Sequence, residues 1–298
     1  MLDTTSVVLI SCFELIYIGQ VISHVWRLFI DNKLFVVLSK LETIHEILIQ
    51  LNVVRPMKVK MNWLFIIGII LNCIGFNIHL VVTIKRNYFQ VVQSLLTPVN
   101  MVAASFCQCF AFYEYILLIL YIQWMVYMIN EQILEKGSSV CTLRDMHLEV
   151  VECLKDINRS IYGLSAVVSF IASNICQIIL TLYYHVIFSR NIYIEGEFLY
   201  AIISILTRLI NIMVLYGIGH ATEKEINRMS LVLHKRSIIE NNPRIKRQIK
   251  FFILRRLHEY YHFELYGICQ INPRQLLILS NKAFAYLVIQ TLFKLNKK

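Results

Sequence analysis

Long apolar runs separated by charged segments make up most of this 298-residue chain. A helix needs ~20 mostly apolar residues to span the hydrocarbon core of a bilayer. Six runs qualify, and they cover residues 7–26, 61–84, 101–128, 161–188, 198–219 and 276–293. The pattern predicts an all-α fold, a multi-pass transmembrane helical bundle that forms one domain over residues 1–298.

The first run is the weakest, because Glu14, Gln20 and His24 interrupt it. No Lys or Arg precedes this run and no small-residue cleavage pattern follows it, in contrast to a signal peptide. We therefore expect residues 7–26 to be a retained helix.

Lys and Arg are distributed unevenly among the connecting segments. Segments 31–60, 128–160 and 220–272 together hold 19 of them, whereas segments 1–5, 85–99, 189–197 and 294–298 hold 6. Because basic residues accumulate on the cytoplasmic side, the first set is predicted to be cytoplasmic and both termini external. The glycosylation triplet at Asn158 then lies in the cytoplasm and is expected to be unmodified.

Two of the cytoplasmic segments have the pattern of amphipathic helices. An apolar stripe at steps of three and four runs through residues 143–164 and continues without a break into the fourth crossing. A second stripe runs through residues 245–257, and Asn241-Asn242-Pro243 separates it from an earlier helix around residues 226–233. Charges of both signs cover the polar faces, which favours packing against protein over binding to anionic lipid.

Composition excludes several classes of protein. Hydrophobic residues make up 57% of the chain and charged residues only 16%, below the roughly 25% of soluble domains. The net charge of +10 resides in the connecting segments, so no nucleic-acid partner is expected. The eight cysteines lack paired metal-ligand spacing, and no nucleophile–base pair or phosphate-binding glycine loop occurs. We therefore expect no metal site, no cofactor and no enzymatic activity.

Charged side chains inside a crossing are costly to bury and indicate a functional or pairing role. Glu114 lies in the middle of the third run and Arg208 near the middle of the fifth, which makes them a candidate intramembrane pair. Tyr113, Glu114 and Tyr115 are also candidates for an aromatic ligand pocket in the outer half of the membrane. Packing between helices is the alternative role for these tyrosines.

The C-terminal third carries a longer motif. Phe263 and Gly267 precede Ile271-Asn272, and a last apolar helix with Tyr286 follows. This order resembles the C-terminal signature of insect gustatory receptors, in which Phe-x-x-x-Gly and an aliphatic residue plus Asp or Asn precede a final helix. Glu225 and the segment 143–163 also resemble that family.

The resemblance has two departures. The family's final helix bears Thr-Tyr, five apolar residues and Gln-Phe, whereas this chain has Ala285 before its Tyr and Leu292 in place of the Gln. Gln290 lies two residues early, about 200° around the helix. The resemblance implies that Tyr286, Gln290 and Phe293 lie near a pore or gate. Gln290 is included although it lies two residues before the position of the family's Gln.

The second departure is the number of crossings. Family members have seven crossings and a cytoplasmic N-terminus, whereas six are counted here with the N-terminus outside. The chain thus corresponds to a family member that lacks its first transmembrane helix.

The resemblance implies a ligand-gated, poorly selective cation channel of the plasma membrane in chemosensory neurons. A small-molecule tastant would bind among the helices, and four identical or related subunits would surround a pore lined by the last helix. One alternative is a non-conducting accessory subunit or a degenerate receptor. Another is a G-protein-coupled receptor, which needs a seventh crossing and a cytoplasmic tail. A secondary transporter usually shows internal repeats and interrupted helices, which this chain lacks.

Overall fold

The computed structural model describes residues 32–51, 65–75, 77, 93–135, 140–161, 167–183, 195–258, 260–265 and 269–295. Two unlabelled helices cover residues 32–50 and 65–75. The labelled elements are α3 (Gln93–Leu134), α4 (Val140–Asp156), the π-helix η1 (Ile157–Ile161), α5 (Ser169–Tyr183), α6 (Glu195–Ile239), α7 (Pro243–His258), β1 (Glu264–Leu265), β2 (Cys269–Gln270) and α8 (Pro273–Leu295). The predicted helical class is confirmed for these residues, apart from the short hairpin. The predicted crossing at 7–26 lies outside them.

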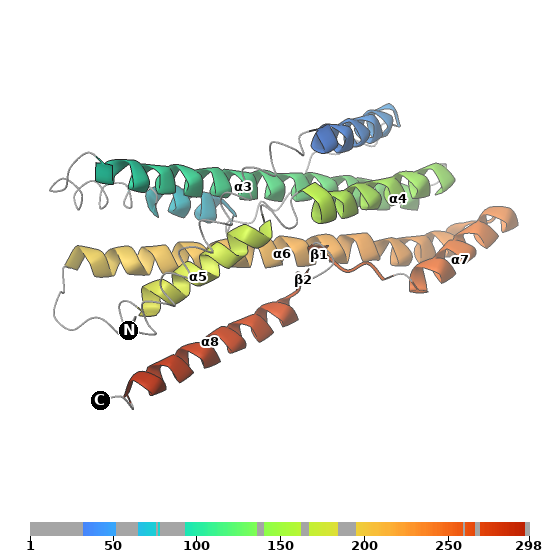
Figure 1. The fold of residues 1–298 in the computed structure, drawn as a ribbon. Coiled ribbons are helices and arrows are strands. Elements are labelled where there is room, and N and C mark those ends of the chain that lie inside the picture. Colours follow the sequence, from blue (N-terminus) through green and yellow to red (C-terminus); the bar gives the residue numbers. More distant parts are fainter. Residues whose placement is uncertain are drawn as a thin grey trace.

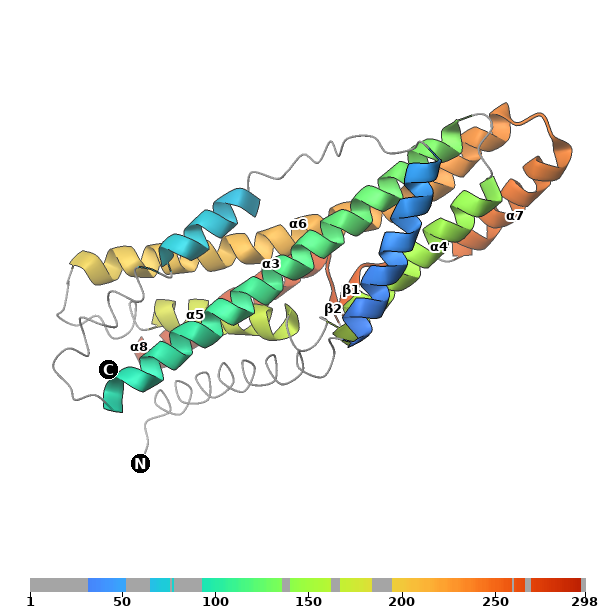
Figure 2. The same cartoon turned by 90° about the horizontal axis from the view of Figure 1, so that it is seen from above.

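The helices α3 and α6 are the two longest, and they run side by side in the same direction (Figures 1 and 2). Both have a stretch long and apolar enough to cross a membrane, Cys109–Leu134 and Ala201–Ile239, and within the described residues these are the two that qualify. The 45 residues of α6 extend about 68 Å, roughly twice the thickness of the hydrocarbon core. The predicted crossing 198–219 and the charged helix around 226–233 are therefore one continuous helix.

The half of the molecule that contains the C-terminal ends of α3 and α6 is rich in charged residues, and we call it the charged half. It is a packed helical bundle. The helix over residues 32–50, together with α4 and α7, lies against the C-terminal halves of α3 and α6 (Figures 1 and 2). The stripe predicted from residue 143 onward is confirmed, because its apolar members are at most 5% exposed. These members are Leu143, Met146, Val150, Leu154 and Ile157. Burial of such a stripe is what stabilises an amphipathic helix in a bundle.

The helix that carries the stripe from residue 143 changes type before the fourth crossing, and residues 162–166, where it would enter that crossing, lie outside those described. The α-helix ends at Asp156, and a π-helix occupies Ile157–Ile161. Asn158 follows Leu154 by four residues, so it falls on the buried face and is only 1% exposed. The amide oxygen of Asn158 accepts a hydrogen bond from the Tyr115 hydroxyl at 2.9 Å, and the wider turn accommodates it. That the glycosylation triplet at Asn158 is unmodified stays a prediction.

The predicted break at Asn241-Asn242-Pro243 is confirmed. Pro243 is the first residue of α7, a position that suits proline because no helical N–H is needed there. The side-chain oxygen of Asn242 accepts from the backbone N–H of Arg244 at 3.0 Å and caps the helix. The backbone N–H of Asn242 donates to the carboxylate of Glu240, and this hydrogen bond, together with Arg236, lowers the pKa of Glu240. The two helices therefore turn back on each other at a defined corner.

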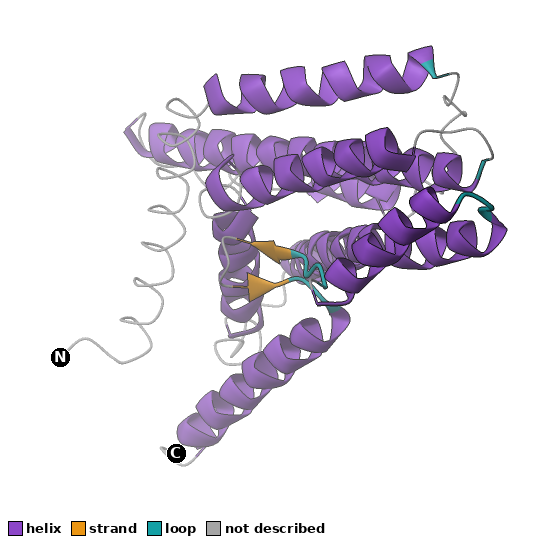
Figure 3. Cartoon of the chain, turned by 90° about the vertical axis from the view of Figure 1, so that its right-hand side faces the viewer, coloured by secondary structure: helices purple, strands orange, loops and turns teal. Residues whose placement is uncertain are grey.

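The last helix, α8, stands apart from the bundle. It points away from the other helices on the side of α6 opposite to α3 and the 32–50 helix (Figures 1 and 3). None of its described side chains is buried. Large apolar side chains on several faces are exposed, among them Phe284 (70%), Ile289 (50%) and Tyr286 (42%). Such surface in one chain indicates that lipid or another protein covers α8.

Candidate functional site

The segment that carries the family-like motif forms a two-stranded hairpin between α7 and α8. β1 and β2 pair antiparallel, with Glu264 opposite Gln270 and Leu265 opposite Cys269. The backbone N–H of Ile271 donates to the Phe263 carbonyl at 2.8 Å and closes the hairpin. Two-residue strands are too short for an alternating pattern to be detected. The sequence therefore showed the motif but not its structure.

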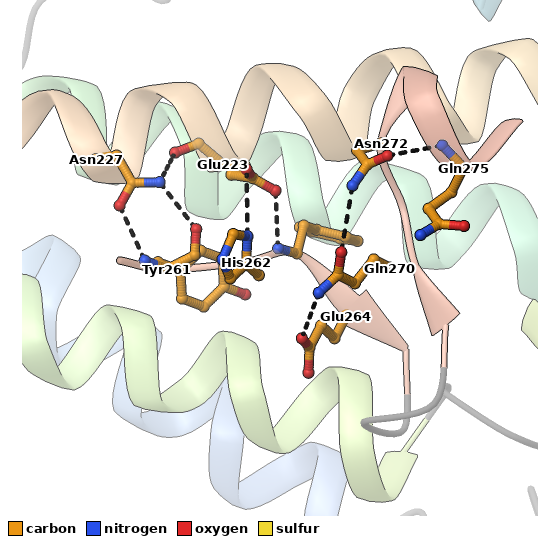
Figure 4. Close-up of polar contacts among 9 residues, drawn as sticks. Glu223, Asn227, Tyr261, His262, Glu264, Gln270, Asn272 and Gln275 are labelled. Atoms are coloured by element: carbon orange, nitrogen blue, oxygen red, sulfur yellow. Dashed lines mark hydrogen bonds and ion pairs between the residues drawn. The ribbon is translucent and has the colours of Figure 1, made fainter. Parts of the chain in front are cut away.

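Asn227 of α6 holds the start of this hairpin with two hydrogen bonds. Its amide nitrogen donates to the Tyr261 carbonyl at 2.9 Å, and its amide oxygen accepts from the Tyr261 N–H at 3.0 Å. The side chain thus pairs with one residue's backbone as a neighbouring strand does (Figure 4). Tyr261 is only 7% exposed, so few alternative partners exist for these backbone groups.

Glu223, one helical turn earlier, holds the next part of the hairpin. Its carboxylate accepts from the Phe263 N–H at 3.0 Å, and its other oxygen lies 3.8 Å from Nδ1 of His262 (Figure 4). Burial, reinforced by the nearby negative charges of Glu223 and Glu264, raises the pKa of Tyr261 well above its usual value. We call Glu223, Asn227 and the residues 261–263 that they hold the α6 clamp. The clamp fixes the hairpin to α6 through main-chain groups.

Gly219, one turn before Glu223, allows the hairpin to lie close to the helix. A methyl group at Gly219 would come within 2.7 Å of Cγ2 of Ile271 and 3.2 Å of the Phe263 ring. Phe263 and Ile271 are themselves 1% and 0% exposed. The absence of a side chain at 219 is therefore a requirement of this packing.

The hairpin ends directly at the start of α8. The Asn272 side-chain oxygen accepts from the Gln275 N–H at 2.8 Å, and Pro273 is the first helical residue. This is a standard N-terminal cap. A hydrogen bond from Gln270 to Glu264 (3.2 Å) links the two strands beside it (Figure 4). The clamp therefore sets the point from which α8 departs.

Farther into the charged half, polar contacts join α3 to α6. The Asn130 amide donates to Oε1 of Glu225 at 3.0 Å, and the Arg228 guanidinium contacts Glu131 at 2.6 Å and Glu225 at 3.2 Å. Glu225, which resembles an acidic position of the gustatory receptors, thus lies at the centre of this contact. Its neighbour Glu223, which sequence reasoning did not single out, contacts the hairpin instead.

Tyr113, a predicted ligand-pocket residue, lies in a polar cluster that joins three helices. The Asn72 amide donates to the Tyr113 hydroxyl at 2.9 Å and to the Asn211 amide oxygen at 2.8 Å, and Tyr113 donates to that same oxygen at 2.9 Å. We call Asn72, Tyr113 and Asn211 the amide cluster. Gly68 lies under it, since a Cβ there would be 2.8 Å from the Tyr113 hydroxyl. Amides isolated in two apolar runs were the available signal for Asn72 and Asn211.

Tyr115 does not join the amide cluster. It is fully buried, and its hydroxyl binds Asn158 of η1. Glu114 and Arg208 are half-buried on the adjacent helices α3 and α6, and Nε of Arg208 donates to Ser204 at 3.2 Å. The Glu114–Arg208 pair stays a prediction, as does the role of these tyrosines in ligand binding.

Of the predicted pore residues, Tyr286 is 42% exposed on α8. Gln290 and Phe293 belong to α8, but their side chains lie outside what the structure describes. Within the described residues no group of three or more His, Cys, Asp or Glu side chains is arranged to hold a metal ion. The site is thus a mechanical junction of helices, with an exposed apolar helix attached to a packed bundle through one clamped hairpin.

The family model described as 7tm Chemosensory receptor matches residues 5–296, which is nearly the whole chain. No curated protein matches it.

Proposed function

The chain belongs to the 7tm chemosensory receptor family, and from this premise we propose that it is a gustatory-type subunit of a ligand-gated, non-selective cation channel. The proposal places it in the plasma membrane as a multi-pass protein of a chemosensory neuron. It assembles as a homo- or hetero-tetramer with related receptors and detects a small-molecule tastant. Membership of the family supports the chemosensory role, and the geometry of α8 supports the channel.

The observation that carries the channel proposal is the exposed α8 helix. Every described side chain on it is at least partly exposed, including Asn281 within the predicted crossing. Lipid tails cover apolar side chains at no cost, but they offer no hydrogen bond to an amide. One face of α8 therefore suits a water-filled path, and the others suit lipid or neighbouring subunits. The adjacent Lys282 is long enough to reach the headgroup region.

The clamp provides a path by which ligand binding at another site changes the position of the pore helix α8. α6 belongs to the amide cluster at Asn211 and to the clamp at Glu223, which is 12 residues or about 18 Å along the same helix. A ligand that displaces α6 near Asn211 also moves the clamp farther along the same helix, and the clamp holds the start of α8. Tyr113 and its amide partners are where we propose that the tastant acts.

Cysteine accessibility tests the pore. Single cysteines along residues 280–292 are introduced, the receptor is expressed in oocytes, and a charged methanethiosulfonate reagent is applied during tastant-evoked current. We expect block at every third or fourth position, with Tyr286→Cys among them. Leu231→Cys, exposed on the far part of α6, is the control that should leave the current unchanged. Currents insensitive to the reagent at all α8 positions contradict a pore lined by this helix.

The alternatives give different recordings. An accessory subunit gives no current alone but changes the currents of a co-expressed receptor. A degenerate receptor does neither, and a G-protein-coupled receptor gives tastant responses that require a G protein. A transporter gives uptake that saturates with substrate.

A further inference from the structure

His262 lies inside the α6 clamp, between the two residues whose backbones the clamp holds. Its side chain is 47% exposed, whereas Tyr261 and Phe263 on either side are 7% and 1% exposed. Hydrogen bonds from residues 261 and 263 to Asn227 and Glu223 fix both neighbours on α6, so the place of His262 between them is fixed as well. The clamp therefore presents a titratable ring to the solvent.

The ring of His262 lies against the carboxylate that holds the clamp. Its Nδ1 is 3.8 Å from Oε1 of Glu223, while Oε2 of Glu223 accepts from the Phe263 N–H at 3.0 Å (Figure 4). The two interactions use different oxygens of one carboxylate, so both are made at once. The Tyr260 ring, whose centre is 5.0 Å from that of His262, packs beside it. A proton on the ring turns the contact with Glu223 into an ion pair and adds a Coulomb attraction to the main-chain hydrogen bond.

Charges on the neighbouring elements leave this attraction in place. Glu264 is two residues beyond His262 in the extended chain, and burial alternates between them, so it lies on the same side and adds a second negative charge. The positive or titratable groups closest to Glu223 on α6 and on the adjoining η1 and α8 are exposed, namely Arg159, His220, Lys224 and Arg274. Water and salt screen exposed charges more than they screen the largely buried Glu223. The carboxylate of the clamp is therefore the main charged partner of the ring.

An imidazole changes charge within the range over which cytoplasmic pH varies. Histidine is the side chain whose ordinary pKa, about 6.5, lies between pH 5 and 8. An ordinary imidazole is about 7% protonated at pH 7.6 and about two thirds protonated at pH 6.2. The hairpin belongs to segment 220–272, whose basic residues predict a cytoplasmic location. The ion pair is therefore present in an acidified cytoplasm and is lost as the pH rises.

We propose that His262 is a proton-binding site through which cytoplasmic acid strengthens the α6 clamp and increases the response to tastant. The clamp passes movement of α6 to the start of α8, so a tighter clamp passes it on with less loss. The proposal rests on the proposed channel function and adds cytoplasmic protons as a second stimulus. Membrane-permeant weak acids, which release protons in the cytoplasm, are the chemical class that acts here.

Amide hydrogen exchange of the full chain in lipid nanodiscs tests the site without any tastant. Wild type and His262→Gln are compared at pH 6.2 and at pH 7.6, because glutamine keeps a polar side chain that takes up no proton. Comparison of the two chains at the same pH removes the intrinsic pH dependence of exchange. We expect exchange of residues 263–265 to be about two- to fivefold slower in wild type at pH 6.2 and nearly equal at pH 7.6. Equal exchange at both pH values overturns the proposal.

Three further variants separate charge from packing in the same exchange experiment. Glu223→Gln keeps an oxygen for the Phe263 N–H but loses the charge, so replacing His262 in this background should no longer change exchange at pH 6.2. His262→Lys is positively charged at both pH values and should show slow exchange at both. His234→Gln, at an exposed position in the charged half of α6, is the matched control that should behave as wild type. A pH-dependent effect of His262 that persists in Glu223→Gln overturns the pairing.

Recordings from excised inside-out patches separate this inference from the proposed function. The stimulus is a compound found by screening sugars, amino acids and alkaloids; it is placed in the pipette, and the bath is set to pH 7.6 or 6.2. We expect wild type to need about two- to fivefold less stimulus for half-maximal current at pH 6.2, and His262→Gln to lose this shift. A shift that His262→Gln retains overturns the regulation and leaves the channel proposal standing. No wild-type current with any stimulus overturns the proposed function, and the exchange ratio still decides whether the proton strengthens the clamp.

Discussion

The helices α6 and α8 are both long and mostly apolar, yet they differ in how much of their surface contacts other parts of the chain. α6 contacts α3, α5, α7 and α8, and side chains such as Leu215 and Ile226 are at most 1% exposed. No described side chain of α8 is buried, and Phe284 is 70% exposed. Hydrophobicity alone therefore does not distinguish a helix of the bundle from one that needs a partner outside its own chain. The two kinds of helix differ in how many other elements of the chain they contact.

This difference in contacts also predicts a difference in rigidity between the bundle and α8. The bundle around α6 is held by buried stripes and by ion pairs such as Arg228 with Glu131, so it is expected to be rigid. α8 is attached to it through the clamp and a capped first turn. A helix attached at one end can change its position while the rest of the chain keeps its packing. Variants of the clamp therefore test this difference between α6 and α8 most directly.

The largest effect is expected at Gly219. Gly219→Val places atoms within the space occupied by Ile271 and Phe263, and overpacking of this kind typically costs about 1–3 kcal/mol. Ile271 is branched next to the contact, so it has little freedom to move aside. We expect loss of most tastant-evoked current and a melting temperature lower by roughly 5 °C.

The matched control for that variant lies two residues away. A methyl group at Gly217 would meet no atom within 4 Å, so Gly217→Ala should keep the current. It should also stabilise the helix by up to about 1 kcal/mol. Equal behaviour of the two glycine variants would show that the hairpin does not depend on α6.

Asn227→Ala is expected to have the next largest effect. It leaves the buried N–H and carbonyl of Tyr261 unpaired, which costs about 1–3 kcal/mol. Amide hydrogen exchange should rise across residues 261–265 while α3 stays protected. The control is Asn227→Asp, which keeps the acceptor for the Tyr261 N–H and loses the donor to its carbonyl. It should fall between wild type and alanine, and unchanged exchange in the alanine variant refutes the clamp.

Sequence reasoning predicted most of the described helices, though not the one over residues 32–50, and it did not predict the contacts that join them. Apolar stripes such as Leu143 to Ile157 and the break at Pro243 follow from local spacing, and both were predicted correctly. Asn227 binds Tyr261, which lies 34 residues away, and Asn72 binds Asn211, which lies 139 residues away. No local pattern determines which distant groups meet. The π-helix at Asn158 was missed for the same reason, because the hydroxyl that Asn158 binds lies on α3, 43 residues away.

A smaller effect is expected at Gly68, in the amide cluster. Gly68→Ala pushes its methyl group against the Tyr113 hydroxyl, which is the far end of a side chain and can shift. We expect a loss of about 1 kcal/mol and a weaker tastant response. Tyr113→Phe removes the hydroxyl, so the double variant should lose less than the sum of the two single variants. Additive losses would show that the tyrosine does not lie over the glycine.

The smallest structural disturbance tests whether the bundle around α4 is closed. Burial of Cys153 raises the pKa of its thiol to about 11, and the side chain is 2% exposed. Because the thiolate is the reactive form, a group with a raised pKa stays protonated as the pH rises past the ordinary value near 9. At pH 9 the thiolate is then about 1% of the thiol, against about half for an ordinary cysteine, so alkylation should be at least roughly 50-fold slower than at Lys155→Cys on the exposed face. Mass spectrometry of alkylated peptides measures both rates in one sample. Equal rates at the two positions would mean that α4 opens from the bundle, and the contrast between a rigid α6 assembly and a free α8 would no longer hold.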